Sequence, residues 1–196
     1  MATTVTLKPN AIDISGSTSG TTTLQATAVA GTTTVTLPAA TDTLVGKATT
    51  DTLTNKTLTS PVATNTLATT IRETATVSAT AATGTINFDT STQVVLYYTT
   101  NASGNFTVNF RSSSGASLDS VMSTGQSLSA TFLVTNGSTA YYNSAVTIDG
   151  NSVTPKWQGG SAPTSGNASS VDSYTYVLLK TGSAAFTVLA SQTKFA

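Results

Sequence analysis

The sequence contains no cysteine and no histidine. These absences exclude disulfide bonds and metal sites built from Cys or His ligands. Charged residues are also scarce, at 8% of the chain with a net charge of zero, where an ordinary globular protein has about 25%. No basic patch is available to attract nucleic acid or an anionic membrane. We therefore expect neither nucleic acid nor a membrane among the partners.

Long apolar stretches are missing as well. No run reaches the roughly 18 residues that a membrane-spanning helix needs. The first 15 residues lack the basic start and the continuous apolar core of a signal peptide. We therefore expect the protein to be made in the cytoplasm, without a secretory leader.

Aromatic residues are absent from the first third of the chain. All 13 Phe, Tyr and Trp residues follow Glu73. Aromatic side chains dominate core burial, so a compact domain without them is not expected. Threonine makes up roughly a quarter of the chain, far above ordinary usage, and its branched side chain favours extended backbone. The sequence predicts an extended Thr-rich arm at residues 1–72 and a folded body at residues 73–196.

The arm contains a nine-residue repeat. Thr-Asp-Thr-Leu at 41–44 recurs at 50–53, and a shorter Thr-Leu-Thr follows at 57–59. One leucine per unit cannot build a core within one chain, so such units bury their apolar side against copies or another chain. We expect Leu44, Leu53 and Leu58 to form an oligomerisation or attachment interface.

Short strands separated by turns are predicted along much of the chain, with almost no helix. In the arm, weakly β-like runs lie at 3–7, 11–14, 21–28 and 32–37. In the body, strands are expected at 74–78, 85–88, 93–99, 105–111, 127–135, 140–143, 146–149, 152–154, 174–180 and 185–191. Asp149-Gly150 or Gly150-Asn151 supplies a tight hairpin turn, and residues 155–172 form a long loop. The fold class is all-β, with an antiparallel, jelly-roll-like β-sandwich as the body.

Two patterns could belong to an enzyme. Ser191 and Lys194 have the spacing of a Ser–Lys nucleophile pair, but in a Ser-rich chain this spacing arises by chance. Four carboxylates that could meet in space are those of Asp89, Asp119, Asp149 and Asp172. Each stands beside Thr, Ser or Gly in an expected turn, where Asp caps the backbone. We expect no catalytic residues, no metal site and no cofactor.

Exposed aromatic residues could bind a sugar or a neighbouring protomer. The candidates are Tyr97, Tyr98, Tyr141, Tyr142, Trp157, Tyr174 and Tyr176. Of these, Trp157, which borders the long loop, and Tyr142 are the expected contact residues. Tyrosine and tryptophan are enriched at protein interfaces, which favours the protomer contact over a host glycan. In a strand, consecutive tyrosines such as Tyr97 and Tyr98 point to opposite faces.

Two segments resemble virion proteins of tailed bacteriophages. Residues 51–61, Asp-Thr-Leu-Thr-Asn-Lys-Thr-Leu-Thr-Ser-Pro, are similar to a segment of tail-fibre, appendage and other structural proteins. Trp-Gln-Gly-Gly at 157–160, Ser-Tyr-Thr-Tyr at 173–176 and Val-Leu-Ala-Ser-Gln at 188–192 resemble the end domain of such proteins.

This resemblance implies a non-enzymatic structural protein located in the virion and made in the host cytoplasm. It implies a homotrimeric fibre or appendage component, attached to capsid or tail proteins through its arm. The alternative is a capsid decoration (cement) protein whose arm crosses neighbouring shell subunits. A glycan-binding or depolymerase module is a third possibility, disfavoured by the few carboxylates and the lack of histidine.

Overall fold

The computed structural model describes residues 5–9, 11–15, 18–25, 32, 34, 52–58 and 61–195, and for residues 5–8 the backbone alone. The chain divides into two units, Met1–Thr64 and Asn65–Ala196. The predicted boundary between arm and body at residues 72 and 73 remains a prediction. No helix in these described ranges is long and apolar enough to cross a membrane.

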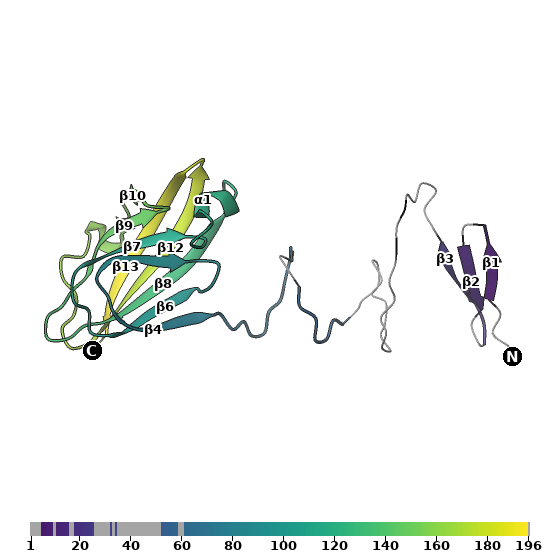
Figure 1. Ribbon diagram of the computed structural model, residues 1–196, viewed down its shortest axis with the longest axis horizontal. Coiled ribbons are helices and arrows are strands. Elements are labelled where there is room, and N and C mark those ends of the chain that lie inside the picture. Colours follow the sequence, from purple (N-terminus) through teal and green to yellow (C-terminus); the bar gives the residue numbers. More distant parts are fainter. Residues whose placement is uncertain are drawn as a thin grey trace. The chain divides into compact units, whose positions relative to one another are not determined.

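The first unit contains a three-stranded antiparallel sheet (Figure 1). Its strands are β1 (Val5–Lys8), β2 (Ala11–Ser15) and β3 (Thr21–Gln25), paired in chain order. All three overlap predicted β-like runs, whereas of the run at 32–37 only Thr32 and Thr34 are described. Part of the predicted arm is thus paired in antiparallel strands, and the extended arm at residues 1–72 stays a prediction. Residues 52–58 and 61–74, by contrast, lie in no strand or helix.

The second unit contains two sheets, and the all-β prediction is confirmed. In spatial order, the four-stranded sheet consists of β10 (Asn151–Val153), β9 (Asn143–Ile148), β7 (Phe106–Arg111) and β5 (Gly84–Asp89). The six-stranded sheet consists of β11 (Lys156–Trp157), β13 (Ala185–Phe195), β12 (Val171–Gly182), β8 (Ser127–Thr135), β6 (Val95–Thr100) and β4 (Ala75–Ala81). The helical elements of this unit are α1 (Leu118–Val121) and the short 3-10 turn Gln158–Gly160.

From β4 to β9 the chain alternates between the two sheets. The strands β4, β6 and β8 pair in parallel in one sheet, and β5, β7 and β9 pair in parallel in the other. Parallel neighbours cannot be joined by a tight hairpin, and here each crossover is a strand of the opposite sheet. The chain therefore winds as a flattened coil of three turns before β10 to β13 complete the unit (Figure 1).

The prediction of an antiparallel, jelly-roll-like sandwich is wrong in its pairing. Five of the eight strand pairs in this unit are parallel, and three are antiparallel. Alternation of apolar and polar residues indicates which side of a strand is buried, but not which strand lies next to it. A corner that crosses to the other sheet has the same short, polar sequence as a hairpin.

One apolar core lies between the two sheets. Its largest fully buried side chains are aromatic: Phe88, Phe106, Phe110, Phe132, Tyr174 and Tyr176. Across the core, the ring of Phe106 lies 5.2 Å from that of Phe132, and the ring of Phe110 lies 4.9 Å from that of Tyr176. These contacts between β7 and the strands β8 and β12 hold the sheets together.

Most predicted strands of the body are present, with shifted ends. The strand at 127–135 begins and ends as predicted. The predicted turn at Asp149-Gly150 is confirmed: both residues have positive φ, 52° and 81°, as a type I′ hairpin turn requires. The strand predicted at 140–143 is wrong, since residues 140–142 precede β9, and the predicted loop at 155–172 contains β11.

Replacing Phe132 by Ala tests the role of this core. Phe132 is fully buried and contacts the rings of Phe106 and Tyr98, so its truncation should lower the free energy of unfolding by about 3–5 kcal/mol. Thr131→Ala, one residue away on the opposite side of β8, is the matched control and should change it far less. Urea unfolding of both variants measures the difference. Equal losses in the two variants would contradict the assignment of the core.

Candidate functional site

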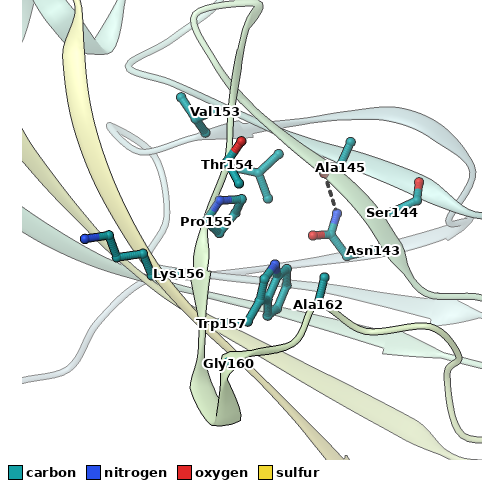
Figure 2. A pocket seen from close by; sticks show the side chains of 11 residues that line it. Asn143, Ser144, Ala145, Val153, Thr154, Pro155, Lys156, Trp157, Gly160 and Ala162 are labelled. Atoms are coloured by element: carbon teal, nitrogen blue, oxygen red, sulfur yellow. Dashed lines mark hydrogen bonds between the residues drawn. The ribbon is translucent and has the colours of Figure 1, made fainter.

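A pocket in the second unit lies beside Trp157. It has a volume of about 600 Å³ and lies between β9 and the segment from β10 to the 3-10 turn. Figure 2 shows the indole ring of Trp157 directed into it, near Asn143 and Ala162, while the Lys156 amino group extends away. Two smaller pockets, of about 420 and 500 Å³, also have Trp157 in their walls. Trp157 is therefore a wall of three separate pockets.

The Trp157 ring is held by aromatic neighbours. It meets the rings of Tyr174 and Tyr176 edge to face, at 6.5 and 6.4 Å. Its backbone pairs in parallel with Ala190 of β13, which places the indole on the core side of the sheet. Within the described part of the chain, no acceptor is bonded to the indole N–H. A half-buried ring with a free donor suits a ligand or partner that offers apolar surface and one acceptor.

Asn143 forms the polar floor of the Trp157 pocket. Its amide Nδ2 donates to the carbonyl oxygens of Phe106 and Ala145, at 3.1 and 2.7 Å, and its Oδ1 accepts from the Tyr176 hydroxyl at 3.2 Å. All its hydrogen-bonding groups are thus used inside the protein. Its role is to fix the start of β9, and the chemistry open to a ligand comes from Trp157 and the hydroxyl of Thr154.

Asp172 anchors the loop that follows the 3-10 turn. It is fully buried, and its Oδ2 accepts from Asn167 N at 3.0 Å, Gln192 Nε2 at 3.2 Å and Asn136 Nδ2 at 3.3 Å. Its Oδ1 accepts no hydrogen bond from the described residues. A side chain at Gly166 would come within 2.9 Å of Oδ2, so the loop can approach this carboxylate only through a glycine.

Burial raises the pKa of the Asp172 carboxyl above its ordinary value. The Asn167 N–H, the Gln192 amide and the nearby Lys194 charge oppose this shift. Burial likewise raises the pKa of Tyr174, whose hydroxyl accepts from Asn143 N and Gln192 Nε2. Asp172 and Tyr174 with their donors Asn136, Asn167 and Gln192 form a hydrogen-bonded cluster, the Asp172 brace, which holds the loop between the 3-10 turn and β12.

The other three aspartates named as candidates have structural partners. Asp89 pairs with Arg111, and Asp119 pairs with Lys180 at 2.7 Å. The hydrogen bond from Lys180 lowers the pKa of Asp119. Asp149 accepts from the backbone N–H groups of Leu118 and Asp119, at 2.6 and 3.0 Å, and so caps α1. In the described residues, no three acidic side chains gather as a metal site would require.

The Ser191–Lys194 pair is not assembled. Ser191 lies within 2.5 Å of the Thr175 hydroxyl on the outer side of the six-stranded sheet. Lys194 is paired in register with Asp172, which points to the core side, and its amino group donates to Ser165 at 3.2 Å. The two side chains thus leave β13 on opposite faces.

The predicted contact residues fall in different places. Tyr142 packs against the core beside β9 and lines no described pocket, so the structure does not bring it together with Trp157. Leu53 and Leu58 are exposed, and Leu44 lies outside the described residues. The tyrosine prediction is confirmed for β6, where Tyr98 packs on Phe132 and Tyr97 lies on the opposite face.

Sequence reasoning missed the roles of Asn143, Asp172 and Gly166. Asn143 follows the Tyr141-Tyr142 pair and carries no sequence signal of its own, and the sequence predicts Asp172 only as a turn residue. A carboxylate two positions before an alternating Tyr-Thr-Tyr run lies on the same side as the tyrosines. That period of two was the available signal for its burial.

The raised pKa of Asp172 predicts a specific pH dependence. A group whose pKa is raised on folding adds stability below its ordinary pKa of about 4, and this contribution is lost as pH rises through the raised value. The free energy of unfolding of the native chain, minus that of Asp172→Asn, should therefore fall as pH rises from about 4. Urea unfolding at a series of pH values measures this difference. A difference that rises or stays constant with pH would rule out the predicted titration.

The geometry of the Trp157 region is the only available guide to its chemistry. No protein-family model, curated protein or solved structure matches this chain. What the described residues provide is an aromatic wall with one free donor, a braced loop and few charges. This combination suits recognition of a surface better than bond-making chemistry.

Proposed function

We propose that the chain is a non-enzymatic structural protein of a bacteriophage virion. In this proposal it is a homotrimeric fibre or appendage component. Residues 1–72 attach it to capsid or tail proteins, and the two-sheet unit forms the exposed body. The resemblance of residues 51–61 and of the C-terminal segments to virion proteins supplies the context.

The observation that carries the proposal is the exposure of apolar residues before the body. Val62, Leu67 and Ile71 are 97%, 94% and 73% exposed, in a segment without strand or helix. Leu53 and Leu58 are exposed too. Burying one such side chain contributes about 1.5–3 kcal/mol. A regular series of them is explained by a partner surface, which a virion protein finds in its neighbours.

The organisation of the charges supports a non-enzymatic role. Asp89, Asp119 and Asp149 are bonded to Arg111, Lys180 and the start of α1. The candidate nucleophile Ser191 has no base beside it. A depolymerase would need two carboxylates facing each other across a sugar, whereas each of these three carboxylates is engaged with a partner inside the protein.

A capsid decoration protein is the second candidate. The same exposed segment could cross neighbouring shell subunits instead of joining three copies of the chain. The two roles differ in copy number, because a fibre is present as a few trimers and a cement protein covers the shell. Quantitative gels of purified particles count the copies and decide between them.

Trp157 is proposed to contact a neighbouring protomer, with a host glycan as the alternative ligand. It is the only tryptophan of the chain, so its fluorescence reports directly on the pockets that it lines. Acrylamide quenching should fall over the concentration range in which the chains assemble, because a protomer would cover the ring. Quenching that stays constant through assembly would mean that the ring remains exposed to solvent in the assembled state. That result would favour the glycan as its ligand.

Self-association is the direct test of the proposal. Sedimentation of the purified chain should show three copies, and a monodisperse monomer at micromolar concentration would contradict the trimer. Leu53→Ala with Leu58→Ala should weaken assembly, since each truncation in a tight site costs about 2–5 kcal/mol.

Thr52→Ser is the matched control for the leucine variants. It changes a neighbouring exposed residue and keeps the hydroxyl, so assembly should be unaffected. Thermal unfolding of the body should be the same in all variants. Undiminished assembly of the double leucine variant would mean that residues 52–58 are only a spacer.

A further inference from the structure

The outer face of the six-stranded sheet, which points away from the core, carries no charge on its five long strands. Register and burial assign the faces of β4, β6, β8, β12 and β13. The charged residues of these strands, Asp172, Lys180 and Lys194, all lie on the core side. Lys156, on the two-residue edge strand β11, is the single charge on the outer side, by its register with Leu189.

Apolar side chains occupy much of this outer face. Its larger members are Val77, Tyr97, Leu133, Val177, Leu179 and Leu189, and Thr and Ser fill most positions between them. Val77 is 66% exposed and Leu189 is 49% exposed. Register places Val77, Tyr97 and Leu133 side by side, and Val177 beside Leu189, with Ser and Thr between the two groups. Exposed apolar patches of this kind are typical of protein interfaces.

A pocket lies in the outer face near β11. It has a volume of about 420 Å³, and its walls include Val177, Leu189, Thr175 and the edge of Trp157. A branched aliphatic side chain matches such a pocket in polarity, and the Thr175 hydroxyl beside it is already bonded to Ser191.

The chain itself contains a segment with matching chemistry. Between Lys56 and Arg72 there is no charged residue, and the described part of this stretch, 61–71, presents Val62, Leu67 and Ile71 to solvent. Every residue from 61 to 77 is exposed.

We propose that residues 61–71 of one copy dock on the outer face of the six-stranded sheet of a second copy, with an aliphatic side chain in the pocket beside Leu189. This inference rests on the proposed self-association and names the surfaces that form it. The donor segment has no charge, and the acceptor face has one, that of Lys156, which also lines the pocket. Donor segment and acceptor face are different parts of the chain, so the contact is head-to-tail, and three such contacts complete a trimer when the rotation between copies closes.

Site-directed cross-linking tests this docking, because the native chain has no cysteine. A tagged Leu67→Cys chain is mixed with an untagged Leu189→Cys chain, co-assembled and treated with a short bis-maleimide. A cross-linked pair of unequal chains can only form between copies. The matched control replaces the acceptor with Thr85→Cys, an exposed position on the four-stranded sheet.

Docking should give at least about tenfold more unequal pair with Leu189→Cys than with Thr85→Cys, because a bound segment has a local concentration near the mM range. Leu189→Lys should also reduce the sedimenting oligomer, whereas Thr85→Lys should not. Equal cross-linking in both mixtures, with oligomers still present, overturns the docking and leaves the proposed function intact. A chain that remains monomeric throughout overturns both.

Discussion

The contact between the rings of Phe106 and Phe132 is the interaction on which the body depends. Because β4 to β9 alternate between two sheets, neither sheet can form as a separate hairpin unit, and each turn of the coil needs both. Phe106 of β7 and Phe132 of β8 come from opposite sheets, and their rings lie 5.2 Å apart. Phe110 and Tyr176 repeat this contact farther along the core. Burial of these rings is what makes the crossing path favourable.

Polar side chains then fix the connections that the core cannot reach. Asp149 caps α1 in the long passage from β7 to β8, and Lys180 donates to the carbonyl oxygens of Asp119 and Met122 in the same passage. Asp172 holds the loop before β12. Several of the few charged residues of the body thus bind the segments that connect its strands. Much of the remaining surface of the body is therefore uncharged.

The sequence could predict the strands but not their partners. Alternation identified the segment 127–135 to the residue, because one face of β8 is buried along its whole length. Asp149-Gly150 identified its turn, since the required positive φ is chemically specific. The parallel pairing was missed because pairing is decided by contacts between distant residues, such as Phe106 with Phe132. Trp157, expected from the sequence to contact a protomer or a glycan, lines the pocket beside β9, and that contact stays a prediction. The brace at Asp172 could not be predicted, since Asn136, Asn167 and Gln192 are scattered along the chain.

An outer face with Lys156 as its single charge limits the forces that can act on it. Val177 and Leu189 can be covered only by apolar burial, whose strength grows with the area removed from water and does not depend on charge. In the proposed assembly, specificity therefore has to come from shape complementarity. The pocket between Leu189 and Trp157 provides a concave site for it. The threonines around it keep an isolated copy hydrated without adding charges that would have to be desolvated on contact. A Thr-rich, nearly neutral chain is in this sense suited to surfaces that are exposed before assembly and buried afterwards.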